Sequence, residues 1–466
     1  MKFRTTLILL AVFAVLLAVV LVFESKGKKD SAAKNKESVL VDAAASDIQK
    51  IELKRADGTI VLQRDDKGGW RLSSPLESKA DTTEADGLAS SLAGLRVDRV
   101  VEKDAKDLKT YGIPQTEVSL WIKGRTAPVR LLVGMENPLD KSLFAKREDD
   151  PRVVLLASYL KTNLEKKVFD FREKAVFKFE TADVKKVRLT AKGVSWEAAR
   201  EGDGWAFEAP FRALAVKSKI DGLLDSLANL KATEFVSENK NSAEIKKLGL
   251  GKPEYEVGLS LPTANKEIVF SLHKADGKSY AMSSEATKIV AFDASSLLAD
   301  LERKPDELRE KKVADFSSWE ADKVSVKKGG FTLGAVKEKV KDEEKWLLDT
   351  PAKDPADGTK VDAFLRRIEG LEAAGFVDNS KNPAEFGLDR PAAEIRVRTK
   401  DVENKLKETV LFIGKEDPAK KQVIIKNAKL EYLFRVDAAF LSDLPKEAKD
   451  WKSEPPKAEE PAAKKK

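Results

Sequence analysis

The residue best suited to acid–base or metal chemistry is the single histidine of the chain, His273, which lies in the segment IVFSLHKA. An imidazole can act as a general base or a metal ligand near neutral pH. The alternative is a solvent-facing residue at the end of a strand. When the internal repeats described below are aligned, His273 falls where the other copies have Gly134 and Gly414. This alignment favours the strand-end interpretation.

Other motifs typical of catalytic or binding sites are weak or missing in this sequence. The 466 residues include no cysteine, so a thiol nucleophile and a cysteine-ligated zinc site are excluded. No serine lies in a GxSxG elbow, and no GxxxxGK[ST] phosphate loop is present. The acidic pairs 65–66 and 149–150 lie in charged turns, and KADGKS at 274–279 is typical of a hairpin turn. We therefore predict no catalytic, cofactor-binding or metal-binding residue, no small-molecule substrate and no enzymatic activity.

Composition favours a folded protein without a nucleic-acid role. Hydrophobic residues make up 42% of the chain, which is enough for a normal core. Charged residues make up 35%, and the formal net charge is only +7. We find no basic stripe interleaved with aromatic residues, so nucleic-acid binding is not expected.

A short tryptophan segment ending in proline occurs three times, as GGWRLSSP, GWAFEAP and KWLLDTP. Its tryptophans and prolines are Trp70 and Pro75, Trp205 and Pro210, and Trp346 and Pro351. A recurrent tryptophan at the start of a short apolar strand indicates packing against a core or at a sheet edge. Stacking on a ligand remains the alternative.

The tryptophan segments belong to a longer repeat. Before each one, apolar alternation around Gly58, Gly193 or Gly330 predicts a β-hairpin. After each one, apolar residues at helical spacing predict one amphipathic helix. A Tyr-Gly, Leu-Gly or Phe-Gly step follows, then further alternating strands and a short closing helix. The glycines of these steps, for which we expect a turn with positive φ, are Gly112, Gly249 and Gly387.

The repeat predicts an α+β protein. We expect a transmembrane helix followed by three tandem units, each a mostly antiparallel sheet with one main packed helix. The predicted segments are a transmembrane anchor at 1–23, a flexible tether at 24–46, repeat units at 47–180, 181–318 and 319–451, and a disordered tail at 452–466.

The N-terminus predicts the location of the protein. Residues 5–23 carry no charge and, at 1.5 Å per residue, would span about 28 Å as a helix, close to the thickness of a bilayer core. A cleaved signal peptide is the alternative, but its apolar region is usually shorter and ends in a small-x-small site, which is missing here. We expect a single-pass signal anchor with the body outside the membrane, in the periplasm if the cell has two membranes.

The chain resembles a bacterial family, the domain-of-unknown-function family 4340. The resemblance rests on a "dG…W…P…AD" block and a "yGL…P" block in the first and third copies. The second copy departs from it, with Val216-Lys217 in place of Ala-Asp. The family has no established activity, and the resemblance implies a membrane-tethered, extracytoplasmic part of a gliding-type ABC export system.

We expect a non-enzymatic accessory or scaffold protein of the inner membrane whose partners are the membrane and other proteins, ABC transporter subunits among them. The alternative is a protein that binds an envelope glycan or another anionic polymer through its lysine-rich faces. An enzyme is a third hypothesis. It would need a concave cluster of carboxylates in a single copy.

Overall fold

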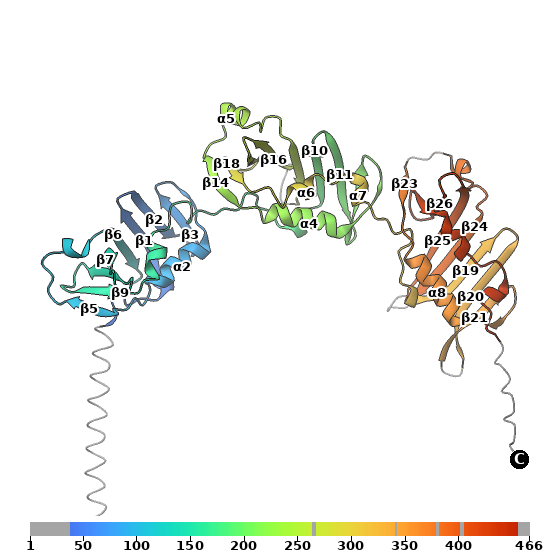
Figure 1. The fold of residues 1–466 in the computed structure, drawn as a ribbon, viewed down its shortest axis with the longest axis horizontal. Helices are drawn as coiled ribbons and strands as arrows, with labels where there is room; N and C mark the ends of the chain where they lie inside the picture. The colour runs from blue at the N-terminus through green and yellow to red at the C-terminus, as the bar shows by residue number, and fades with distance from the viewer. Residues whose placement is uncertain (1–37, 263–266, 341–342, 379–381, 401–404, 455–466) are drawn as a thin grey trace, which may run out of the picture. The chain divides into compact units, whose positions relative to one another are not determined.

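The computed structural model describes residues 38–262, 267–340, 343–378, 382–400 and 405–454. This part of the chain divides into two compact units between Ala175 and Val176. The first unit holds one nine-stranded antiparallel sheet, and the second unit holds two (Figure 1). Three repeated antiparallel sheets confirm the repeat that the sequence predicts.

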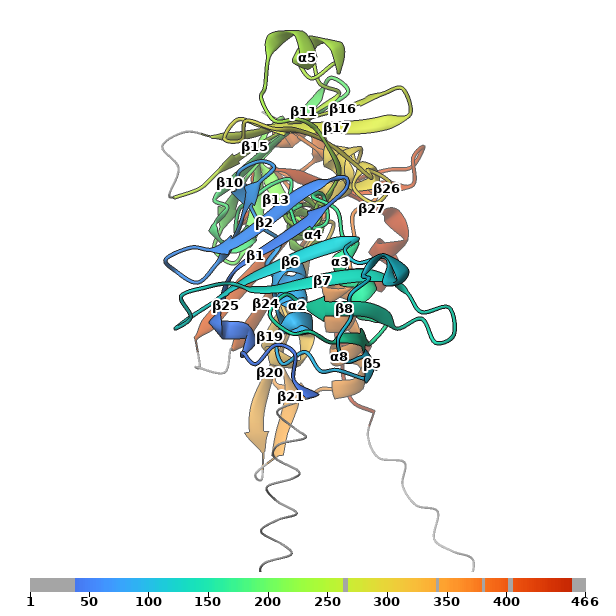
Figure 2. The ribbon, with the colours of Figure 1, turned by 90° about the vertical axis from the view of Figure 1, so that its left-hand side faces the viewer.

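The first sheet has the strand order β4-β3-β2-β1-β6-β7-β8-β9-β5 (Figure 2). Its strands are β1 (Ile48–Arg55), β2 (Gly58–Arg64), β3 (Trp70–Ser74), β4 (Ser78–Lys79), β5 (Arg99–Glu102), β6 (Thr116–Ile122), β7 (Val129–Glu136), β8 (Leu143–Arg147) and β9 (Val153–Leu156). Its helices are α2 (Thr82–Leu92) and α3 (Leu160–Leu164), with 3-10 turns η1 (Ala45–Asp47) and η2 (Lys109–Tyr111).

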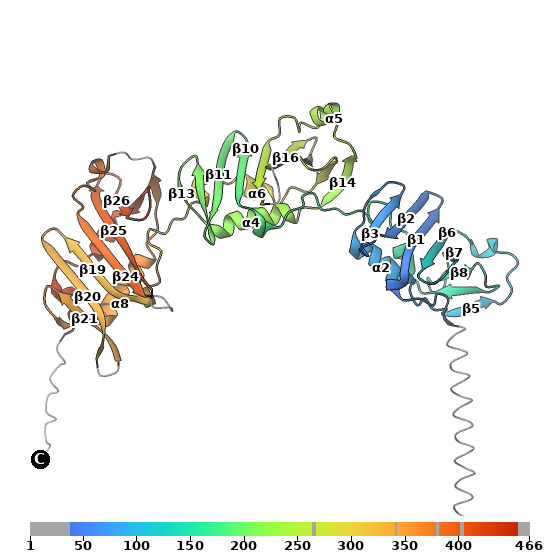
Figure 3. The ribbon, with the colours of Figure 1, turned by 180° about the vertical axis from the view of Figure 1, so that it is seen from behind.

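The second sheet repeats this order as β13-β12-β11-β10-β15-β16-β17-β18-β14. Its strands are β10 (Lys186–Ala191), β11 (Val194–Glu201), β12 (Gly204–Ala209), β13 (Ala213–Ala215), β14 (Ala232–Ser237), β15 (Tyr255–Ser260), β16 (Ile268–Ala275), β17 (Lys278–Ser283) and β18 (Ile289–Phe292). Its helices are η3 (Thr181–Asp183), α4 (Lys217–Ala228), α5 (Ser242–Lys247), α6 (Leu298–Leu301) and α7 (Pro305–Leu308), of which α4 lies along the sheet (Figure 3).

The third sheet has the order β22-β21-β20-β19-β24-β25-β26-β27-β23. Its strands are β19 (Ala321–Lys328), β20 (Phe331–Val340), β21 (Glu343–Thr350), β22 (Asp354–Pro355), β23 (Gly375–Val377), β24 (Ala393–Lys400), β25 (Leu406–Asp417), β26 (Gln422–Asn427) and β27 (Leu433–Asp437). Its helices are η4 (Ser318–Glu320), α8 (Gly358–Glu369), η5 (Pro383–Phe386), η6 (Ala438–Asp443) and η7 (Ala448–Asp450).

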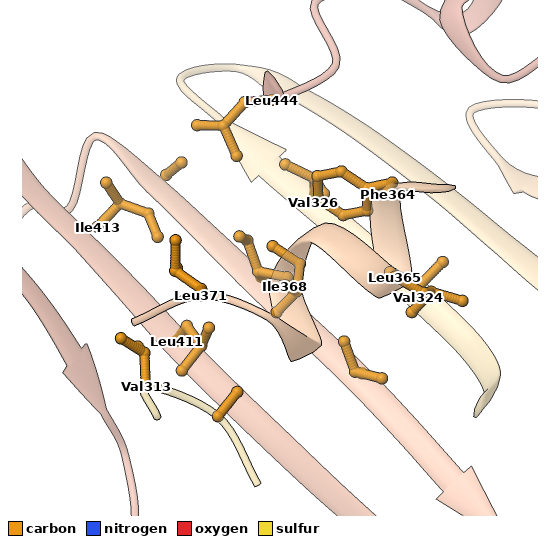
Figure 4. Packing of buried hydrophobic residues seen from close by; sticks show 14 of the residues in the cluster. Val313, Val324, Val326, Phe364, Leu365, Ile368, Leu371, Leu411, Ile413 and Leu444 are labelled. Atoms are coloured by element: carbon orange, nitrogen blue, oxygen red, sulfur yellow. The ribbon is translucent and has the colours of Figure 1, made fainter. Parts of the chain in front are cut away.

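Each copy buries one face of its main helix against its own sheet. In the third copy, Phe364, Leu365 and Ile368 of α8 pack against residues of β19 and β25, such as Val326 and Ile413 (Figure 4). The strands alternate between buried and partly exposed residues, as in β24, because one side of the sheet faces the helix and the other faces water. The fold is therefore mostly sheet, with one main helix per copy.

The start of each main helix explains a difference between the copies. Asp81 accepts a hydrogen bond from the amide of Glu84, and Asp357 accepts from the amides of Thr359 and Lys360, so both aspartates cap their helices. Val216 stands at this position in the second copy and gives no side-chain cap. The second copy keeps the alanine, because Ala215 bridges Arg309 as Ala80 bridges Arg172, so the predicted alignment of Val216-Lys217 with Ala-Asp is wrong by one residue. The departure from the family pattern is therefore the loss of a helix cap at Val216.

A short apolar segment precedes each sheet and packs under its helix. The amides of Leu40, Val176 and Val313 donate to the carbonyls of Leu95, Leu230 and Leu371, each a residue just beyond a main helix. Leu40 and Val313 are fully buried. These contacts lie before the predicted starts at 47, 181 and 319, and Leu40 and Val41, within the predicted tether, are buried in the first core.

No helix among the described residues is long and apolar enough to cross a membrane. The predicted transmembrane helix at 1–23 and most of the tether lie outside these residues. Most of the predicted disordered tail lies outside them as well, although Ser453 donates its backbone amide to the carbonyl of Pro355.

Candidate functional site

The three recurrent tryptophans each join a strand to the main helix of their own copy. Trp70, Trp205 and Trp346 are 3%, 1% and 5% exposed. Their Nε1 atoms donate to aspartates 16 residues further on, at 2.7, 2.8 and 2.9 Å. The acceptors are Asp86 of α2, Asp221 of α4 and Asp362 of α8. A buried indole that also satisfies its N–H in this way serves the packing of the helix on the sheet.

A cation covers the indole in every copy. The guanidinium carbons of Arg64 and Arg200 lie 4.2 and 4.5 Å from the ring centroids of Trp70 and Trp205, and the Nζ of Lys337 lies 5.1 Å from that of Trp346. These distances fit cation–π contacts. Because the indoles are buried as well as covered by a cation, the structure favours packing over the ligand stacking that the sequence left open.

In the second copy the aspartate of this cluster has a shifted pKa. Burial raises the pKa of Asp221, but hydrogen bonds from Lys217 and Trp205 and the charge of Arg200 outweigh burial and hold the pKa below its ordinary value. The carboxylate is therefore ionised at neutral pH and acts as a fixed acceptor.

The recurrent prolines and glycines shape the chain around this cluster. Pro75, Pro210 and Pro351 all follow cis peptide bonds at the end of the tryptophan strand. Gly112, Gly249 and Gly387 have φ angles of +62°, +72° and +70°, a region that favours glycine. The recurrent prolines thus follow strand ends and the recurrent glycines lie in turns, whereas the tryptophans are part of strands.

His273 lies on β16, where its pairing in the sheet can be compared with the other copies. Leu272 pairs with Tyr255, as Val133 pairs with Thr116, so His273 takes the position of Gly134. A β-bulge follows Val133 in the first copy, whereas β16 continues regularly to the Asp276-Gly277 hairpin turn.

The glycines that stand in place of His273 are packed too tightly for a side chain. A Cβ at Gly134 would lie 2.3 Å from the carbonyl oxygen of Tyr111, and one at Gly414 would lie 2.2 Å from that of Phe386. In the second copy the imidazole of His273 lies against Gly249 instead, and its Nδ1 is buried without a hydrogen-bond partner among the described residues. The histidine therefore packs against the Leu-Gly turn.

The acidic pairs of the sequence stabilise turns. Asp65 accepts from the amides of Lys67 and Gly69, and Asp150 pairs with Arg152 at 2.6 Å. Among the described residues, no group of three or more His, Asp or Glu side chains is close enough to hold a metal ion.

A buried arginine joins the second and third copies inside the second compact unit. Arg309 is 0% exposed, and its two terminal nitrogens donate to Asp378 at 2.9 and 2.7 Å. Its guanidinium carbon lies 4.0 Å from the ring of Phe211 and 3.7 Å from that of Phe376. The ion pair is thus enclosed by aromatic rings from both copies, an arrangement in which arginine stacks well.

Beyond Arg309 the chain enters the third copy and is hydrogen-bonded to it. Val313 and Ala373 take part in backbone hydrogen bonds to Leu371 and Lys311, and the buried side chain of Asn427 donates to the carbonyl of Val313 at 3.0 Å. Sequence reasoning assigned Arg309 no role. The aspartates beneath the tryptophans were also missed, although their constant spacing of 16 residues from each tryptophan was visible.

The remaining tryptophans differ in burial. Trp196 and Trp451 are 2% and 3% exposed and belong to the second and third cores. Trp121 lies beside Lys50, whose Nζ is 4.1 Å from the ring centroid. Trp319 is 71% exposed. These four do not share the acceptor that the recurrent tryptophans have.

The fold of three similar sheets and the repeated tryptophan cluster define a tandem-repeat protein, and the comparisons place it in a family. The chain belongs to the family described as Domain of unknown function (DUF4340), whose model matches residues 70–239, 205–384 and 346–462. Each match begins at a recurrent tryptophan. The middle match contains both Arg309 and Asp378, so the family unit includes the two sides of the junction between the second and third copies.

Two further comparisons add no functional argument. No curated protein matches the chain. One solved structure, a crystal structure of the DNA polymerase sliding clamp from Pseudomonas aeruginosa with ligand, is 9% identical, covers 86% of this chain and 93% of its own, and has a TM-score of 0.14. A likeness this low carries no argument about fold or function.

Proposed function

We propose that the protein is a non-enzymatic scaffold or accessory protein, anchored in the bacterial inner membrane by residues 1–23, whose body binds partner proteins on the extracytoplasmic side. The observation that supports this proposal is the use of the recurrent residues. In each copy the tryptophan contacts both its aspartate and its cation. What is shared among the copies serves the fold, and the surfaces that differ among them are available for partners.

The junction at Arg309 supports the same proposal. A scaffold must hold its binding surfaces at fixed separations, and an ion pair whose guanidinium is fully buried between aromatic rings resists sliding of one sheet against the next. Partner proteins of an ABC-type export complex fit the resemblance given above, because such a complex has membrane subunits that an anchored scaffold could contact.

The test is co-purification of the full-length protein. The tagged chain is extracted from membranes in mild detergent, and co-purifying proteins are quantified by mass spectrometry. The control is the anchor segment 1–37 fused to an unrelated soluble domain, which reports contacts of the anchor alone. We expect permease and ATPase subunits to be enriched with the full chain only. Recovery of the same proteins with the control, or of none with either, contradicts the proposal.

A further inference from the structure

The third copy carries a groove with a cationic rim and an aromatic floor. It has a volume of about 540 Å³ and lies between α8 and the chain segment that follows η6. Phe364 and Trp451 form the floor, with ring centroids 5.2 Å apart. Lys360, Arg367 and Lys446 contribute the positive charges of its lining. The volume falls within the range of sites that bind ligands or peptide side chains.

The first copy has a carboxylate at one position of the rim, whereas the second and third copies have Lys219 and Lys360 there. In the first copy, Glu84 of α2 forms an ion pair with Lys166 at 2.5 Å. Glu84 lies two residues before Asp86, the acceptor of the tryptophan, and Lys360 lies two residues before the equivalent Asp362. Lys360 therefore takes the place of a glutamate.

The position of Lys166, the second residue of this ion pair, keeps its positive charge in the third copy. Lys166 lies six residues before Arg172, which forms a β-bridge with Ala80, and Lys446 lies six residues before Lys452, which forms the equivalent bridge with Ala356. An ion pair in the first copy has thus become two lysines in the third. Two like charges on one groove leave a place for an anionic group.

The acidic groups in the groove are already engaged. Asp443 accepts from Arg367 at 2.6 Å, and Asp450 accepts from the backbone amides of Lys446 and Glu447. Lys360 has the helix-capping Asp357 at 3.8 Å, and the ammonium of Lys446 makes no ion pair within the described residues, although, against the effect of burial, its charge helps to hold the pKa of Asp450 below its ordinary value. The groove therefore keeps a net positive charge, because its lining holds three cations, Lys360, Arg367 and Lys446, and only two carboxylates.

We propose that this groove binds an acidic segment of a partner protein, with a carboxylate between Lys360 and Lys446 and an apolar side chain against Phe364 and Trp451. Glu84 shows that a carboxylate fits this position, and the aromatic floor suits a peptide with an apolar residue next to its acid better than a bare phosphate polymer. The inference rests on the proposed scaffold function and names the surface that it would use.

Binding is measured by fluorescence anisotropy with full-length protein in detergent. The probe is a labelled synthetic peptide of about ten alternating glutamate and leucine residues, with a glutamine–leucine peptide as the neutral control. The test variant is Lys360→Glu, which restores the ion pair of the first copy and closes the groove. The matched control is Lys219→Glu, the same charge change two residues before Asp221 on α4. Circular dichroism verifies the fold of both variants.

We expect the acidic peptide to bind, the neutral peptide to bind about tenfold more weakly or not at all, and affinity to fall between about 50 and 500 mM salt. Lys360→Glu should weaken binding about tenfold or more, whereas Lys219→Glu should leave it unchanged. The proposal is overturned if the acidic peptide does not bind, if both variants weaken it equally, or if polyphosphate binds at this groove in its place. If Lys360→Glu leaves binding of the acidic peptide unchanged while partner proteins still co-purify, the groove proposal fails and the scaffold proposal stands.

Discussion

At the level of single residues, the packing of each main helix depends on the hydrogen bond between the tryptophan and its aspartate. Sequence patterns identified the tryptophans because they recur beside prolines, but an aspartate in an amphipathic helix resembles any solvent-facing acid. The buried indole N–H explains why this aspartate is needed, because an unsatisfied buried donor destabilises a fold.

Replacing Asp86 with alanine should lower the free energy of local opening of α2 by about 2 kcal/mol, since the Nε1 of Trp70 loses its acceptor and Arg64 loses an ion-pair partner. Native-state hydrogen exchange of the α2 amides measures this change. Asp66→Ala, at an exposed residue of the β2–β3 turn, is the control and should leave α2 unchanged. Equal protection of α2 in both variants would contradict the structural role of the cluster.

The pKa of Asp221 gives a second prediction. Although burial raises it, the contacts with Lys217, Trp205 and Arg200 hold this pKa below its ordinary value in the folded protein. The ionised carboxylate therefore stabilises the fold fully above the unfolded pKa of about 4, and this contribution is lost as the pH falls through the lower folded pKa.

Asp221→Asn should accordingly reduce the acid dependence of the thermal midpoint below about pH 4 and lower stability at pH 7. Thermal unfolding followed by circular dichroism between about pH 2 and pH 7 compares the variant with the wild type. An acid dependence that is the same in both proteins would show that Asp221 is not stabilised by its partners.

At the scale of elements, the hairpins, the three main helices and the repeated strands could be predicted from the sequence, because period-2 and helical alternation reflect one-sided burial. The short segments that open each copy could not, since Val39, Leu40 and Val41 are only three apolar residues after a polar stretch. Val216 is the opposite case. The sequence visibly departs from the family pattern there, and the structure shows that the departure removes a helix cap.

Two glycine substitutions in the first copy should have opposite effects, one at the β-bulge of β7 and one in α2. Gly134→Ala should destabilise the first copy by about 2 kcal/mol, because the new Cβ would lie 2.3 Å from the carbonyl oxygen of Tyr111. Gly87→Ala, in α2 with open space around it, should stabilise by about 0.5–1 kcal/mol. Hydrogen exchange in β7 and α2 measures both, and a neutral Gly134→Ala would show that the bulge can relax.

The junction between the second and third copies predicts a further difference. Asp378→Ala should leave the fully buried guanidinium of Arg309 without its main acceptor, at a cost of about 3 kcal/mol. We expect faster proteolysis of the segment at 310–317, where the chain passes from one sheet to the next. Asp389→Ala, an exposed acid of the same copy, is the control. Unchanged cleavage in Asp378→Ala would contradict a role for the ion pair in fixing the junction.

At the scale of the whole molecule, three copies of one sheet share their internal contacts and differ on their surfaces. The sequence showed the repeat and the family, but it could not show the groove beside α8, because the groove arises where two lysines distant in the chain replace an ion pair. The exchange of Glu84 for Lys360 becomes meaningful only when the partners Lys166 and Lys446 are known.

The most direct test of a scaffold with copy-specific surfaces is quantitative co-purification of wild-type, Lys360→Glu and Lys219→Glu full-length proteins from cells, each with unchanged circular dichroism. We expect about tenfold less of at least one partner protein to co-purify with Lys360→Glu, whereas Lys219→Glu should retain the wild-type amount. Identical partner recovery by all three proteins would contradict this proposal, because the groove of the third copy would then carry no partner.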